Sequence, residues 1–403
     1  MTTMRIVIAP DKFKGSLTAV EAARAIAEGV MLADPDAEVR LSPMADGGEG
    51  TIEVMGHSIE GADIRVARVA GPLPGLKVDA SWVYLPAGAG VSARVEDEFS
   101  SMLNRDEPTA VIEMAQASGY ALVPAEARDP FTTTTYGTGQ LISEALDAGC
   151  RQIVVGMGGS ATVDGGTGMA TALGFKFLDA RGGELAGAGG SLEKIRSIDA
   201  SGRDERLLTT SFVAATDVDS PLVGPAGAAR VFGPQKGASA DKVEALERGL
   251  VNLGSLISNR GIDVLDIPGA GAAGGLGAGL AAFCGASIVS GVRLIASVTG
   301  LRRKIAGADL VLTGEGTYDS QTARGKTPAG VASIAAEEGV PAIVLAGSVS
   351  GHDHDYPAFC ILPGPIGLAE AMADAHQLLV SGSARLMRLL DTCRDGSPPP
   401  PSA

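Results

Sequence analysis

Six glycines and one carboxylate follow a short apolar run in Val155-Gly156-Met157-Gly158-Gly159-Ser160-Ala161-Thr162-Val163-Asp164-Gly165-Gly166-Thr167-Gly168. The apolar run, Ile153 to Val155, predicts a buried strand. Successive glycines let main-chain N–H groups converge on an anion, and a carboxylate among them is placed to hold a cation. The stretch therefore predicts a phosphate and metal site at the end of a strand.

This stretch also resembles the dinucleotide fingerprint G-x-G-x-x-A, through Gly156, Gly158 and Ala161, with Asp179 near the usual spacing of about 20 residues. That fingerprint needs an unbroken helix from its second glycine onward. Asp164-Gly165-Gly166 falls inside the required helix, where each glycine costs about 1 kcal/mol. The pattern disfavours nicotinamide binding, but a NAD-dependent oxidoreductase acting on a small hydroxy acid remains an alternative.

Two further matches to nucleotide motifs are weaker. Gly269 to Gly274 repeats the dinucleotide pattern but follows a proline turn at Pro268 rather than a strand. Gly325-Lys326-Thr327 ends like a P-loop, yet Ser320 stands where that motif requires glycine. If the protein binds ATP, it does so without a standard P-loop.

Composition limits the partners. A chain of 403 residues predicts two or three domains. Its net charge of −15 repels nucleic acid and anionic membranes, and an aromatic content of 4% argues against base-stacking platforms. We therefore expect small-molecule substrates, captured by local clusters of Lys, Arg and N–H groups, and neither nucleic acid nor membrane as a partner.

The four cysteines are scattered and predict reduced thiols in a cytoplasmic protein. The first apolar run, Ile6 to Ala9, is too short for a signal peptide, and no run of 18 apolar residues predicts a membrane span. The sequence leaves the oligomeric state open, with a homodimer as one alternative.

Alternating strands and helices at both ends of the chain predict an α/β fold with a doubly wound parallel sheet. The predicted strands are Arg5 to Ala9, Glu38 to Leu41, Leu310 to Thr313, Ala342 to Ala346 and Phe359 to Leu362. The predicted helices are Thr18 to Leu32, Glu49 to Met55, Pro328 to Glu338 and Leu368 to Leu390. Thr18 and Glu21 fit a capping box, and Thr327 fits an N-cap.

The middle of the chain has a different pattern. Ile64 to Val69 and Val78 to Leu85 alternate on either side of a proline-glycine turn, which predicts an antiparallel hairpin. We expect residues 1–63 and 291–393 to form a discontinuous Rossmann-like domain and residues 64–290 to form an inserted α+β domain. The tail, residues 394–403, contains four consecutive prolines and is expected to be disordered.

Three polar loops follow predicted parallel strands: Pro10 to Leu17, Pro43 to Thr51 and Thr313 to Ser320. Because the carboxyl ends of parallel strands meet at one edge of a sheet, these glycine- and carboxylate-containing loops predict a site.

The motifs of these loops resemble those of the type-1 bacterial glycerate kinases, or glycerate 2-kinases. The resemblance runs from about residue 4 to 390 and rests on Ala9 to Leu17, Asp46 to Thr51, Gly158 to Thr162, Asp164 to Gly166, Gly233 to Gly237, Pro268 to Gly275, Gly314 to Gly316, Asp319 to Thr322 and Gly325-Lys326. It implies a two-domain fold with a flavodoxin-like part and ATP-dependent phosphorylation of D-glycerate, usually to 2-phosphoglycerate. Val163, Thr317-Tyr318, Asp219-Ser220 and Ser287 to Val292 depart from the family pattern and leave the exact hydroxy acid open.

Phosphoryl transfer needs cations and N–H groups for the phosphates, a carboxylate-held Mg²⁺ and a base near the attacking hydroxyl. We expect Asp164, with Asp46 second, to act as the base beside catalytic Lys14, and Asp217 and Glu315 to hold the metal. Asp319 competes for these roles. The predicted residues for binding substrate and nucleotide are Lys12, Ser16, Gly47, Gly48, Gly158, Gly159, Ser160, Thr162, Gln235, Lys236, Gly325 and Lys326. A non-catalytic protein that binds small acids is the second alternative.

Overall fold

The computed structural model describes residues 3–89, 104, 106–319, 326–351 and 355–395. The chain divides into two compact units. The first unit holds the described residues up to Ala45 and from Ile295 onward, and the second holds those from Asp46 to Leu294. The sequence pattern predicts that the chain passes between the domains near residues 64 and 290. In the structure the first passage lies earlier, between Ala45 and Asp46. None of the described helices has the length and apolar character that a membrane crossing needs.

The first unit contains five parallel strands in the order β13-β12-β11-β1-β2, as predicted for a doubly wound sheet. In the register of this sheet, Ile6 lies between Leu310 and Val39. The strands are β1 (Arg5–Ile8), β2 (Glu38–Leu41), β11 (Leu310–Tyr318), β12 (Ala342–Val349) and β13 (Ala358–Cys360).

Strand β11 is longer than predicted. Thr317 and Tyr318 still pair with Ser348 and Val349 of β12, and Tyr318 is fully buried. The prediction of a polar loop from Thr313 is therefore wrong, because these residues continue the sheet ladder. Ser320, at the end of the predicted loop, lies outside the described residues.

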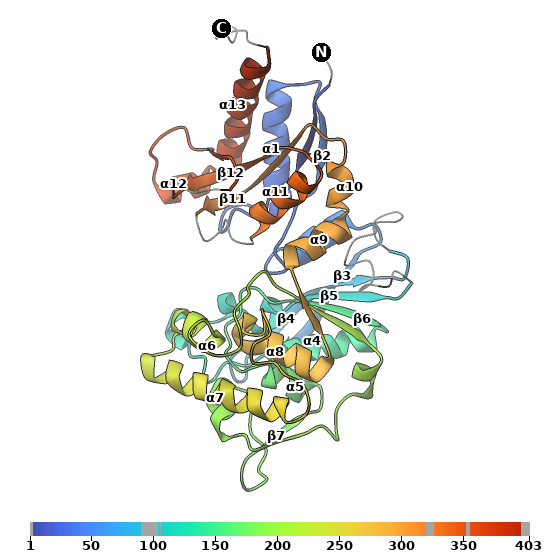
Figure 1. Cartoon of the computed structure of the whole chain (residues 1–403), viewed down its shortest axis with the longest axis vertical. Helices are drawn as coiled ribbons and strands as arrows, with labels where there is room; N and C mark the ends of the chain where they lie inside the picture. The colour runs from blue at the N-terminus through green and yellow to red at the C-terminus, as the bar shows by residue number, and fades with distance from the viewer. Residues whose placement is uncertain (1–2, 90–103, 105, 320–325, 352–354, 396–403) are drawn as a thin grey trace. The chain divides into compact units, whose positions relative to one another are not determined.

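Helices α1 (Ala19–Ala33) and α13 (Ala375–Asp395) run side by side in the first unit (Figure 1). They approach so closely that a Cβ on Gly29 would lie 2.2 Å from the carbonyl oxygen of Val380. The capping box at Thr18 and Glu21 is confirmed by both of its hydrogen bonds. The remaining helices of this unit are α10 (Leu301–Ile305), α11 (Thr327–Glu337) and α12 (Leu368–Ala373).

The predicted helix from Leu368 to Leu390 is two helices, because α12 ends at Ala373 and α13 begins at Ala375. Helix α13 continues to Asp395 and so includes the first two residues of the predicted disordered tail. The rest of that tail, residues 396–403, lies outside the described residues.

The second unit contains a six-stranded sheet in the order β10-β9-β6-β5-β4-β3. The predicted hairpin is confirmed, since β3 and β4 pair antiparallel from Asp63 with Tyr84 to Ala70 with Lys77. The next strands, β5, β6, β9 and β10, are parallel, which the sequence pattern does not indicate. The strands are β3 (Asp63–Ala70), β4 (Lys77–Leu85), β5 (Thr109–Glu113), β6 (Gln152–Gly156), β9 (Ser211–Ala215) and β10 (Ser287–Val289), with a separate pair β7 (Lys176–Leu178) and β8 (Ser197–Asp199).

Every residue of β5 and β6 is buried, as expected for central parallel strands covered on both faces. The α-helices around this sheet are α2 (Thr51–Ser58), α3 (Ala115–Ser118), α4 (Tyr136–Asp147), α5 (Thr167–Ala172), α6 (Ala228–Phe232), α7 (Ala240–Ser258) and α8 (Ala272–Cys284). Helix α9 (Gly291–Thr299) contains the second crossing. The 3₁₀ turns are η1 (Tyr120–Leu122), η2 (Ala125–Ala127), η3 (Gly189–Lys194), η4 (Glu205–Leu208) and η5 (Pro234–Lys236).

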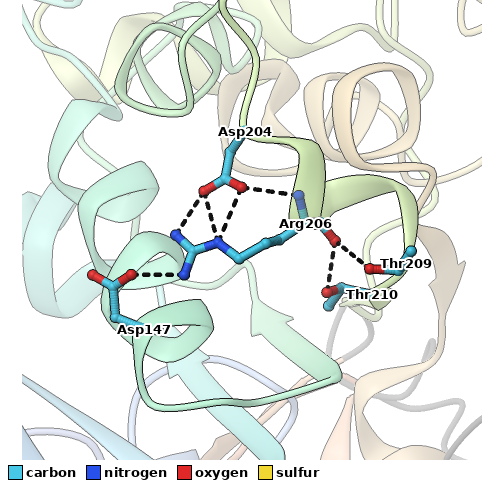
Figure 2. A network of polar contacts seen from close by, with 5 residues as sticks. All are labelled: Asp147, Asp204, Arg206, Thr209 and Thr210. Carbon is cyan, nitrogen blue, oxygen red and sulfur yellow. Dashed lines mark hydrogen bonds and ion pairs between the residues drawn. The ribbon is translucent and has the colours of Figure 1, made fainter.

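Arg206 joins the end of α4 to η4 on the surface of the second unit (Figure 2). Its guanidinium donates to Asp204 at 2.7 Å and to Asp147 at 2.7 Å, and its carbonyl oxygen accepts from Thr209 and Thr210. Hydrogen bonds from Arg206 are the main cause that lowers the pKa of Asp204 below its usual value. These partly exposed contacts tie two peripheral segments together.

Candidate active site

Two glycine loops of the second unit touch without side chains between them. A Cβ on Gly156 would lie 1.8 Å from the carbonyl oxygen of Gly47, and one on Gly158 would lie 2.5 Å from the Cα of Gly48. Gly47 also has a φ of +82°, which L side chains rarely adopt. The loop after β2 is therefore held directly against the end of β6, which explains why Asp46 belongs to the second unit.

Asp164 is fully buried and accepts four hydrogen bonds. The amide and hydroxyl of Thr135 both donate to Oδ2 at 2.8 Å, and the amides of Gly166 and Gly168 also donate to this carboxylate. Burial raises the pKa of Asp164, and these hydrogen bonds oppose the rise. Both oxygens are engaged in fixing the glycine loop to the start of α4, which argues for an anchoring role rather than the predicted role of base.

Lys236 is 3% exposed and lies against the same loop. Its Nζ donates to Ser160 Oγ at 2.6 Å and to the carbonyl oxygen of Thr162 at 2.7 Å. Burial lowers the pKa of Lys236 to about 7, while the charge of Asp164 acts to raise it. The predicted binding residues Ser160, Thr162 and Lys236 are thus brought together and contact one another, whereas Gln235 is exposed.

The backbone segments that carry Asp46 and Asp217 are neighbours, since a Cβ on Gly47 would lie 3.1 Å from Ala215 and one on Gly291 would lie 2.0 Å from the carbonyl oxygen of Asp46. Asp217 follows β9 and accepts from Ser290 Oγ at 2.6 Å and from the amide of Val292 at 3.0 Å. Burial, with a smaller contribution from the charge of Asp46, raises the pKa of Asp217 to about 6. Asp46 is half-buried and accepts from the amide of Gly48 at 2.9 Å.

This pair fits a divalent cation chemically. Mg²⁺ prefers oxygen ligands and is usually held by one or two carboxylates together with substrate phosphates. A cation would also relieve the repulsion by which Asp46 raises the pKa of Asp217. No group of three or more His, Cys, Asp and Glu side chains with metal-binding geometry occurs within the described residues. The predicted ligand Glu315 lies half-buried on β11 of the first unit.

The remaining predicted residues lie in the first unit, around the loop after β1. Asp11 is buried and accepts from the amide of Lys12 at 2.7 Å and from Thr327 Oγ1 at 2.6 Å, so the loop is tied to the start of α11. Ser16 Oγ donates to the carbonyl oxygen of Phe13, and Lys14 is exposed.

Helix α11 begins one residue earlier than predicted. Lys326 is the N-cap, with an extended backbone and an exposed side chain, and Thr327 is the first helical residue. The prediction of Thr327 as N-cap is wrong because its hydroxyl donates to Asp11 instead of accepting from its own helix. Gly325 lies outside the described residues.

Sequence reasoning missed Glu113, Thr135 and Ser290. Thr135 and Ser290 donate to Asp164 and Asp217, and Glu113 is 2% exposed at the end of β5. A charged residue that closes the apolar run Ala110 to Ile112 was a signal for Glu113. Thr135 and Ser290 are 29 and 73 residues from their partners, and nothing local marks them.

Glycine loops and neighbouring carboxylates at the carboxyl ends of parallel strands are the arrangement in which α/β enzymes bind small molecules. The dinucleotide alternative fails because residues 159–166 form no helix and α5 begins only at Thr167. The chain belongs to the glycerate kinase family, whose model matches residues 6–391.

Several relatives share this family. A glycerate kinase of Halalkalibacterium halodurans is 46% identical over 93% of this chain and 95% of its own length. A glycerate 2-kinase of Escherichia coli K12 is 45% identical over 96% of this chain and 98% of its own length. The crystal structure of a protein assigned as glycerate kinase 2 from Salmonella typhimurium LT2 superimposes with a TM-score of 0.80 at 42% identity, covering 98% of this chain and 100% of that one.

Proposed function

We propose that this protein transfers the γ-phosphoryl group of ATP to D-glycerate and releases 2-phosphoglycerate, with Mg²⁺ as the metal cofactor. Family membership supports the reaction class, and the 2-position is proposed from the E. coli relative. The observation that carries the proposal is the half-buried pair Asp46 and Asp217 beside backbone built from glycines. Phosphoryl transfer depends mainly on such positioning and charge neutralisation.

Asp217 would hold Mg²⁺, with Glu315 kept as a second predicted ligand. When bound, Mg²⁺ neutralises negative charge on the transferring phosphates. The hydrogen bonds from Ser290 and Val292 fix the carboxylate of Asp217 in one orientation, which suits a metal ligand.

Asp46 is the better candidate for the base. It is half-buried, and its position is fixed by the glycine contacts of its own loop. Asp164, the first choice from the sequence, is committed to four hydrogen bonds and has no exposed surface. Asp46 would therefore accept the proton of the glycerate hydroxyl as the phosphoryl group is transferred.

The binding roles divide by burial. Lys236, Ser160 and Thr162 would shape the loop from within, and the backbone of Gly47, Gly48, Gly158 and Gly159 would face the phosphates. In the first unit, Lys12, Lys14, Ser16 and Lys326 would bind an anion of one substrate, and Gln235 of the second unit stays a predicted binding residue. The four cysteines are unpaired, as is usual in the cytoplasm, and we propose that compartment.

The test is incubation with ATP, Mg²⁺ and a panel of hydroxy acids, with products identified by phosphorus NMR. We expect 2-phosphoglycerate from D-glycerate only when Mg²⁺ is present. Asp46→Asn should lower kcat by about a hundredfold or more, because it removes the base. Asp179→Asn, at an exposed turn, is the matched control and should retain activity.

Each contrary outcome has a separate meaning. Formation of 3-phosphoglycerate alone would overturn the position of transfer. Binding of glycerate without any turnover would favour the non-catalytic alternative, and normal turnover of Asp46→Asn would remove Asp46 as the base.

A further inference from the structure

We propose that Glu113 is a positioning residue for phosphoryl transfer, which fixes the first turn of α2 and thereby the loop that carries Asp46. This inference rests on the proposed function of Asp46. It assigns a mechanical role in catalysis to a buried carboxylate that touches neither substrate nor metal in the proposed mechanism.

Glu113 is the last residue of β5 and lies opposite Gly156 in the parallel ladder with β6. The amide of the next residue, Met114, donates to the carbonyl oxygen of Gly156 at 3.0 Å. Gly156 is the residue on which the carbonyl oxygen of Gly47 rests. Glu113 therefore stands beside the contact between the two glycine loops.

The side chain of Glu113, on strand β5, caps the N-terminus of helix α2. Its Oε1 accepts from the amide of Ile52 at 2.7 Å in a buried environment. The N-cap of α2 is Gly50, which has no side chain to cap the helix, and the amide of Thr51 donates back to Gly48. A carboxylate at this end also interacts favourably with the helix dipole. Glu113 thus supplies the cap that the local sequence lacks.

A second contact orients the carboxylate. Gln116 Nε2 donates to Glu113 Oε2 at 3.3 Å, and Gln116 Oε1 accepts from the amide of Ser81 on β4 at 3.4 Å. The cap is therefore connected to two strands of the central sheet.

The link from Ile52 to Asp46 is short and rich in glycine, since Gly47, Gly48 and Gly50 lie between them. Glycines impose little conformational preference, so the position of Asp46 depends on anchors at the ends of this segment. Displacement of a catalytic group by about 1 Å can cost a hundredfold in rate. Loss of the anchor at Ile52 should consequently reduce turnover more than binding.

The experiment is a double-mutant cycle between Glu113→Ala and Asp46→Asn, read by steady-state kinetics with ATP and D-glycerate. Glu113→Ala alone should lower kcat by about tenfold to a hundredfold and leave both KM values within about threefold. If Glu113 acts through Asp46, adding Glu113→Ala to Asp46→Asn should cost less than about threefold more. Full additivity of the two losses, or normal kcat in Glu113→Ala, overturns the proposal.

Two conservative variants keep the test decisive if Glu113→Ala does not fold. Glu113→Gln keeps an oxygen acceptor at the same reach and should retain kcat within about fivefold, whereas Glu113→Asp shortens the side chain and should lose about tenfold. The reverse order would overturn the cap as the reason. Glu107→Ala removes an acid near the other end of β5 and is the matched control, expected to behave as wild type.

A readout without activity separates this inference from the proposed function. Amide exchange over residues 46–55, followed by mass spectrometry, should be about tenfold or more faster in Glu113→Ala or Glu113→Asp and unchanged in Glu113→Gln. If wild-type protein forms no phosphoglycerate, the proposed function fails while this arm still tests the cap. Equal exchange in all the variants would overturn the proposal.

Discussion

The loop after β6 and the loop after β1 look alike in sequence, because each combines glycine with charged residues at the end of a parallel strand. In the second unit, Asp164 of the loop after β6 and Lys236 of η5, which contacts that loop, are buried and hydrogen-bonded within the protein. In the first unit, Asp11 is buried, but Lys14 and Lys326 beside it are exposed. The comparison teaches that a buried charge among glycines is used up by contacts within the protein, whereas an exposed one stays accessible to a ligand.

The largest expected effect tests the scaffold side of this comparison. Asp164→Asn places an NH₂ group among amide and hydroxyl donors in a fully buried site, so we expect a loss of about 3 kcal/mol or more in the free energy of unfolding. Urea denaturation measures it. Asp179→Asn, whose partners are exposed backbone amides, should cost less than about 1 kcal/mol. Equal stability of Asp164→Asn and wild type would show that the hydrogen bonds of Asp164 contribute little to stability, and would contradict the anchoring role.

A smaller effect tests the binding side. Lys326→Met should weaken binding of one anion, an ATP phosphate or the glycerate carboxylate, by about tenfold to a hundredfold, because charge-assisted contacts contribute roughly 1.5 to 3 kcal/mol. The KM that rises identifies the ligand, and stability should hardly change, since the side chain is exposed. Lys77→Met, at another exposed lysine, is the control. No change in either KM would place Lys326 among ordinary surface residues.

The third prediction uses the pH dependence of the free energy of unfolding to test whether burial lowers the pKa of Lys236. With a pKa near 7 in the folded state and a usual value of 10.5, the folded protein binds fewer protons than the unfolded chain between these values. Stability should therefore rise with pH, by about 1.5 kcal/mol between pH 7 and 8.5 from this group. The difference between wild type and Lys236→Met in denaturation at several pH values isolates it. A pH-independent difference would show that Lys236 stays fully charged.

The smallest effect concerns a charge network outside both loops. Arg206→Met removes two ion pairs whose side chains are partly exposed, 37% for Arg206, 63% for Asp147 and 21% for Asp204. The loss in the free energy of unfolding should therefore be about 1 kcal/mol or less, as measured by urea denaturation. High salt should shrink the difference. A loss as large as that of Asp164→Asn would contradict the comparison between buried and exposed charges.

Local patterns predicted much of the first unit. Strand β2 and the capping box of α1 match the structure, because short-range periodicity and capping chemistry determine them. The extension of β11 through Thr317 and Tyr318 was missed, since only pairing with β12 makes polar residues and glycine part of a strand. In the second unit, the buried strand predicted from Ile153 to Val155 is confirmed as β6, but its parallel pairing with β5 and β9 was missed because the crossover connections are long and irregular.

The candidate site shows the same limit. Motifs identified Asp46, Asp164, Asp217 and Lys236 as residues of interest, but their roles depend on partners far along the chain. The hydrogen bonds from Thr135 favour an anchoring role for Asp164 over the role of base, and Lys236 contacts Ser160 across 76 residues of sequence. A sequence pattern identifies the chemical groups, whereas their burial and their contacts determine which role each group can play.

The contact between Gly48 and Gly158 also limits how this protein can change over generations. At a contact between two side chains, a substitution to a larger residue can be compensated by a substitution to a smaller residue at the other position. Gly48 and Gly158 already have the smallest possible side chain, so neither can compensate for the other. Enlargement of either one therefore has no compensating partner. Substitutions that change substrate choice must then occur at surrounding positions, while these two positions are expected to remain glycine.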